Sequence, residues 1–117
     1  MTRREFEKVV KAAVESLPAP LRERIENVHF VVAESPHRRR RGQSGELYGL
    51  YEGVPFHHRG PDYQGALPDR ITIFKRTIER DFKTREEMTR AIQDTVIHEV
   101  GHYFGFDDDQ LNDLGIG

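Results

Sequence analysis

The most informative stretch of the chain reads HEVGHYFGFDD and covers residues 98–108. It closes a segment that starts with the capping-box pattern of Thr84 followed three residues later by Glu87. Apolar residues then recur at the 3.6-residue helical period. They are Met88, Ile92, Val96, Val100, Tyr103 and Phe104. These signals predict one long helix over residues 84–104, ended by Gly105, which adopts a left-handed turn at low cost.

The polar residues of this stretch have the spacing of a metal site. His98 and His102 are four apart, so a helix places both imidazoles on one face, where they can share one ion. If the chain turns back at Gly105, Asp108 can add a carboxylate oxygen and leave a fourth position for water. Glu99 can take the proton of that water. A random chain of this composition would carry the full pattern only about 2 times in 10,000.

The elements upstream are shorter. Thr2 and Glu5 form another capping-box pattern, and apolar residues from Phe6 to Leu17 follow at helical spacing, which predicts an N-terminal helix ended by Pro18 and Pro20. Residues 21–26 are expected to add a helical turn. Strands are predicted at 28–34, 47–54 and 70–75, loops at 37–46 and 55–68, a connection at 76–83, and a short turn at 110–114. Glycines within 47–54 favour an edge position in the sheet.

Length and composition limit the possible classes of protein. With 117 residues, the chain is expected to form a single domain over residues 1–117. The absence of cysteine excludes thiolate metal sites and disulfide scaffolds. We expect a cytoplasmic protein without a membrane span, because no apolar run is long enough. The net charge of −2 makes nucleic-acid binding an unlikely function despite the basic run Arg38–Arg41, and carboxylates concentrate in the second half.

Several stretches together resemble one protein family. HEVGHYFGFDD is similar to the extended zincin signature HExxHxxGxxD, and LYGLYEGVP, LPDRITIFKR and DDDQLNDLG complete a resemblance to the minimal zincin-like metallopeptidases of bacteria. The resemblance implies an α+β fold with a small mixed sheet of three or four strands and an antiparallel edge strand. It also implies an N-terminal backing helix and an active-site helix that carries His98, Glu99 and His102. By the same motif, Asp108 would be the third Zn²⁺ ligand.

Three functions remain open at this point. The first is a zinc-dependent metallopeptidase in which Glu99 is the general base and a peptide or protein substrate lies along the edge strand 47–54. The second is a metal-dependent hydrolase similar to small bacterial endoribonucleases, and the third is a zinc-binding protein without turnover. The oligomeric state stays undetermined. His57 or His58 could assist the site, Tyr48 and Tyr51 could polarise a carbonyl, and Tyr103 is expected to pack in the core.

Overall fold

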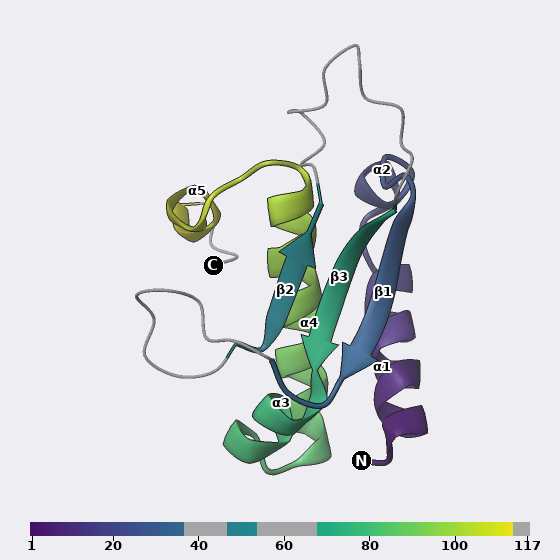
Figure 1. Cartoon of the computed structure of the whole chain (residues 1–117), viewed down its shortest axis with the longest axis vertical. Coiled ribbons are helices and arrows are strands. Elements are labelled where there is room, and N and C mark those ends of the chain that lie inside the picture. The colour runs from purple at the N-terminus through teal and green to yellow at the C-terminus, as the bar shows by residue number, and fades with distance from the viewer. Residues whose placement is uncertain (37–46, 54–67, 114–117) are drawn as a thin grey trace.

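The structure is a computed structural model, and it describes residues 1–36, 47–53 and 68–113. The helices in these ranges are α1 (Arg3–Glu15), α2 (Ala19–Arg22), α3 (Lys75–Asp81), α4 (Arg85–Tyr103) and α5 (Asp108–Asp113). The strands are β1 (Val28–Ala33), β2 (Gly49–Glu52) and β3 (Asp69–Phe74). The α+β class expected from the sequence is therefore confirmed, with the three strands forming one sheet (Figure 1).

The sheet is mixed, and its strand order is β1-β3-β2. The central strand β3 pairs parallel to β1, with Val28 opposite Asp69 at one end and Ala33 opposite Phe74 at the other. It pairs antiparallel to β2, in a register that places Tyr51 opposite Ile71. The predicted antiparallel edge strand is thus present as β2.

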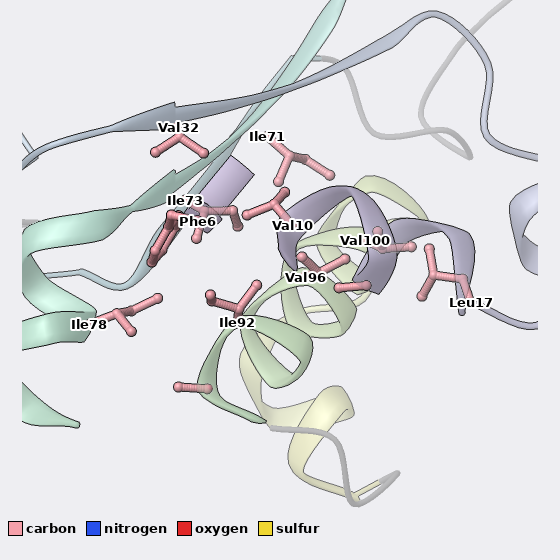
Figure 2. Close-up of a cluster of buried hydrophobic side chains, with 12 residues drawn as sticks. Phe6, Val10, Leu17, Val32, Ile71, Ile73, Ile78, Ile92, Val96 and Val100 are labelled. Carbon is pink, nitrogen blue, oxygen red and sulfur yellow. The ribbon is translucent and has the colours of Figure 1, made fainter. Parts of the chain in front are cut away.

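Helices α1 and α4 pack against one face of this sheet. Buried side chains from both helices and from the strands meet in one apolar cluster, and Figure 2 shows them pointing toward one another. Its labelled members are Phe6, Val10, Leu17, Val32, Ile71, Ile73, Ile78, Ile92, Val96 and Val100. The predicted backing helix therefore holds α4 against the sheet through apolar contact, the main source of helix stability in proteins. Among the described helices, none has the length and apolar character that crossing a bilayer requires.

The boundaries of the elements differ from the predictions by a few residues. Strand 47–54 was predicted too long, because only Gly49–Glu52 pair with β3, while residue 54 lies outside the described ranges. The predicted turn at 21–26 is instead α2, at Ala19–Arg22. Pro20 does not stop a helix there. It lies in the first turn of α2, where a missing N–H costs no hydrogen bond.

Helix α3 is absent from the sequence prediction, which treated residues 76–83 as a connection. Its N-cap is Phe74, which supplies no side-chain hydrogen bond, so no capping residue signals the start of the helix. The fold places it there because Thr77 and Ile78 are fully buried. The predicted terminal turn at 110–114 is likewise a longer helix, α5, which starts at Asp108.

Candidate metal centre

Two histidines on the last turns of α4 form the centre of the candidate site. The predicted capping box at the start of this helix is present, since the Thr84 side chain accepts from the Glu87 backbone N–H and the Glu87 side chain accepts from that of Thr84. The helix runs unbroken to Tyr103, so His98 and His102 lie one turn apart on the same face. Their Nε2 atoms are 3.0 Å apart, and the ring planes are inclined at 84°.

The turn that ends α4 orients one of these rings. Gly105 has φ of 94°, its N–H donates to the His102 carbonyl, and the Phe106 N–H donates to the Gly101 carbonyl. This pair of bonds is a Schellman motif, which glycine favours because it has no Cβ. The turn also brings the Phe106 carbonyl oxygen within 2.8 Å of Nδ1 of His102. A carbonyl can only accept, so Nδ1 carries the hydrogen and the neutral ring directs the lone pair of Nε2 into the site.

Helix α5 brings Asp108 back over the histidines. The Asp107 carboxylate accepts from the Gln110 N–H, while the Gln110 side chain accepts from the Asp107 N–H, and both distances are 2.8 Å. This reciprocal pairing fixes the start of the helix. Oδ1 of Asp108 then lies 3.2 Å from Nε2 of His98 and 3.1 Å from Nε2 of His102.

The packing of α5 onto α4 depends on a glycine inside the long helix. Leu111 is fully buried, and a Cβ added at Gly101 would lie only 2.4 Å from its Cδ2. A larger residue at position 101 would therefore force the Leu111 side chain, and with it the packing of α5 on α4, to shift. Glycine inside a helix costs about 1 kcal/mol relative to alanine, and here that cost has a packing reason.

Glu99 lies beside the histidines but faces the sheet. It is 7% exposed, and its Oε1 accepts a hydrogen bond of 2.8 Å from the backbone N–H of Tyr51 on β2. Glu99 and His102 line an open cleft of about 390 Å³. The other residues that line it are Tyr51, Gly53, Gly105, Phe106, Asp107 and Asp108.

The donors in the cleft fit a divalent transition metal. One ring nitrogen of His98, one ring nitrogen of His102 and a carboxylate oxygen of Glu99 all lie within 4.8 Å of one another. Asp108 offers a second carboxylate. Its Oδ1 lies 3.2 Å from Nε2 of His98 and 3.1 Å from Nε2 of His102. Of the two carboxylates, we favour Asp108 as the third donor, because Oε1 of Glu99 is already held by β2. Imidazole and carboxylate donors with an open side are the set that catalytic zinc uses.

A comparison with protein families agrees with this geometry. A family model described as zincin-like metallopeptidase matches residues 25–117, which include the whole sheet and the stretch 98–108. The chain belongs to the zincin-like metallopeptidase family. In a comparison with curated proteins, nothing matches this zincin-like chain. The family match supports a metallopeptidase at the level of the family only.

The structure describes only some of the other candidate residues of the zincin-like protein. Tyr103 is fully buried and packs in the core, as expected. Tyr48 bonds to Asp81 through its hydroxyl group, outside the cleft, whereas Tyr51 lines the cleft. His57, His58 and Arg38–Arg41 lie outside the described residues.

Some contributors to the site were missed by sequence reasoning. The Tyr51 amide depends on a contact between residues 48 positions apart, for which the sequence carries no local signal. The contact of the Phe106 carbonyl with His102 involves a backbone group, so the side-chain pattern of the sequence does not indicate it either. Gly101 did carry a signal, because a glycine inside a strong helical pattern usually has a packing or functional reason.

Proposed function

We propose that this zincin-like protein is a zinc-dependent peptidase. The observation that carries the proposal is the convergence of two imidazole nitrogens and one carboxylate oxygen within 3.2 Å of one another, with the Glu99 carboxylate alongside. Three electron-rich atoms this close favour a cation between them. The family match supports a peptide as the substrate, since the family is one of metallopeptidases.

His98, His102 and Asp108 would hold the zinc ion in this proposal. When bound, zinc supplies Lewis acidity, which polarises a peptide carbonyl and makes a water molecule more acidic. The Phe106 carbonyl would keep the His102 ring in the orientation and tautomer that ligation requires, because it accepts from Nδ1 and leaves Nε2 to face the metal.

Glu99 would move the proton. Oε1 stays hydrogen-bonded to the Tyr51 N–H, so we assign proton transfer to Oε2. Oε2 accepts a proton from the attacking water and returns it to the nitrogen of the leaving amine, as a general base and then a general acid.

The substrate would lie along the outer edge of β2. The Tyr48 carbonyl accepts from the Phe74 N–H, so alternation along the strand turns the backbone groups of Tyr48, Leu50 and Glu52 toward β3. Those of Gly49 and Tyr51 then point away from β3, on the side where the Tyr51 N–H donates to Glu99, so a peptide would pair with the backbone groups of Gly49. A peptide added there would gain main-chain hydrogen bonds with little demand on its side chains, so specificity would be broad.

The alternative of an endoribonuclease-like hydrolase is less well supported. A carboxylate directly after the first histidine, as Glu99 is, belongs to the peptidase arrangement. The family match favours the same choice.

The test compares zinc content and peptide hydrolysis in three proteins. The unchanged protein should hold one zinc per chain and cleave unstructured peptides. Glu99→Gln keeps the size of the side chain but removes the base, so it should retain zinc and lose about 10²–10⁴-fold in turnover. The double variant His98→Ala, His102→Ala should lose both zinc and turnover.

Two results would count against the proposal. Zinc retained by the double histidine variant would place the metal elsewhere, and zinc without any hydrolysis would leave a binding protein. Glu99→Gln also serves to locate the peptide, because it binds without cleaving. Added peptide should shift the amide signals of β2 more than those of β1, the opposite edge of the sheet, and the reverse pattern would contradict the assignment to β2.

A further inference from the structure

A buried carboxylate close to the site has no part in the mechanism described above. Asp69 is the first residue of β3, it is 3% exposed, and its Oδ2 accepts a hydrogen bond of 2.6 Å from the Tyr51 hydroxyl group. Withdrawing a carboxylate from water costs free energy unless hydrogen bonds replace the lost hydration. Asp69 also lies 29 positions before the first histidine of the motif, so the motif does not explain it.

Tyr51 contacts both Asp69 and Glu99 and so connects the two carboxylates. Its hydroxyl group donates to Asp69, and its backbone N–H donates to Oε1 of Glu99 over 2.8 Å. The Tyr51 ring also packs edge-on against the buried ring of Tyr103, with 6.0 Å between the centroids. A side chain held at both its ring and its hydroxyl group limits rotation of the backbone that carries it, so the direction of the amide is fixed.

The end of β2 encloses the carboxylate from another side. A Cβ added at Gly53 would lie 2.4 Å from Oδ1 of Asp69, so only a glycine allows this approach of the two strands. Asp69 is consequently covered by the residue two positions after Tyr51 as well as by Tyr51 itself. The contact sets where the strand ends relative to β3.

We propose that Tyr51 and Asp69 are positioning residues for Glu99. This inference rests on the proposed function, in which Glu99 moves the proton. Asp69 holds the Tyr51 ring, the ring fixes the amide, and the amide holds Oε1 so that Oε2 faces the cleft. The hydrogen bonds run from Tyr51 to Asp69 and from Tyr51 to Glu99, so loss of the pair should misplace the base and leave the metal in place.

The experiment uses Tyr51→Phe and Asp69→Ala, which removes the acceptor of the Tyr51 hydroxyl group, in the zinc-loaded full chain, with Tyr48→Phe as the matched control. Tyr48 precedes the same strand and its hydroxyl group also donates to a carboxylate over 2.6 Å, that of Asp81, but its backbone carbonyl faces β3. The Glu99→Ala variant removes the acceptor of the position-51 amide. Its spectrum therefore gives the reference signal for this amide without the hydrogen bond to Glu99. The readouts are the proton shift and hydrogen exchange of that amide, zinc affinity, and kcat and KM.

We expect both variants of the pair to move the position-51 amide signal toward that of Glu99→Ala and to speed its exchange. Zinc affinity should stay within about twofold, while kcat falls about tenfold or more at nearly unchanged KM, the pattern of a misplaced catalytic group. Tyr48→Phe should change none of these. Asp69→Ala decides the matter if Tyr51→Phe does not fold.

An amide signal that stays at its original position in a folded pair variant would overturn the inference. Equal effects of Tyr48→Phe would also overturn it, because they would indicate a general loss of sheet stability. If the unchanged protein cleaves no peptide, the proposed function fails, and the amide signal alone still decides whether Tyr51 and Asp69 position Glu99.

Discussion

Asp108 shows how closely one side chain of the site depends on its neighbours in sequence. Three aspartates follow one another at 107–109, and the structure gives the first two different positions. Asp107 holds the start of α5 through its reciprocal bonds with Gln110, while the Asp108 carboxylate reaches both imidazoles. Within this run of identical residues, Asp107 therefore has a structural role and Asp108 lies at the candidate site.

We predict that the three aspartates differ in their effect on zinc binding. Asp108→Asn should weaken zinc affinity at least about 10-fold, since even changes around a metal's direct ligands typically cost that much. Asp107→Asn retains a side-chain oxygen for the helix cap, and it and Asp109→Asn should cost little. Titration of each variant with zinc against a competing chelator measures the difference. Equal losses at all three positions would indicate diffuse electrostatic attraction instead of ligation.

At the residue scale, sequence predicts what local spacing determines. The placement of His98 and His102 on one face follows from the helical period, and the return of the chain follows from Gly105. Which aspartate faces the histidines was inferred from the motif, and the structure places Asp108 there. The Tyr51–Glu99 and Tyr51–Asp69 contacts could not be predicted, because they depend on which strands pair and in which register.

At the scale of elements, the distance between β2 and α4 is set by Gly49. A Cβ at this position would lie 2.6 Å from Cγ2 of Thr95, 3.1 Å from the Thr72 carbonyl oxygen and 3.2 Å from Cγ of Glu99. The strand can therefore lie this close to the helix only without a side chain at position 49. Glycines in this segment predict an edge strand, and β2 is at the edge of the described sheet, but close approach to the site helix is the stronger constraint on Gly49.

We predict that Gly49→Ala destabilises the protein by about 1–3 kcal/mol, the usual cost of overpacking. Thr95→Ser removes the closest methyl group and keeps the hydroxyl group that donates to the Ala91 carbonyl over 2.7 Å. Combining the two changes should recover part of the lost stability, as measured by urea unfolding of all four proteins. Simple addition of the two single effects would show that the contact with Thr95 is not the cause.

Local sequence patterns predict the ends of some helices and strands, whereas tertiary contacts determine the ends of others. Helix α4 has a capping box, an apolar stripe and a glycine stop, and it was predicted almost to the residue. Helix α3 has no capping residue and forms because its buried residues complete the core next to the sheet. The short extent of β2 follows from pairing with β3, which no local pattern contains.

At the scale of the whole molecule, part of the acid sensitivity should come from Asp81. Hydrogen bonds from the Arg80 guanidinium and then from the Tyr48 hydroxyl group lower the pKa of Asp81 from 3.8 to about 2. The contact with Asp81 also raises the pKa of Tyr48. A carboxylate with a lowered pKa stabilises the fold above the pKa of the unfolded chain, and this contribution disappears as the pH falls through about 2.

We therefore predict that Asp81→Asn lowers stability near neutral pH and that the difference from the unchanged protein shrinks between about pH 4 and pH 2. The effect should be small and should weaken in high salt, because the pair is exposed to solvent. Thermal unfolding at several pH values, at low and high salt, measures it. A difference that stays constant down to pH 2 would assign the effect to lost packing of the side chain.

If the proposed site holds zinc, the contact between Leu111 and Gly101 would couple metal occupancy to the folding of the C-terminal helix. Leu111 and Asp108 belong to the same six-residue helix, so an α5 that detaches from Gly101 also withdraws a carboxylate from the site. Zinc that binds only the docked state would add about 2.7 kcal/mol of stability at a concentration 100 times its Kd. The melting temperature of the protein would then report the concentration of free zinc around it.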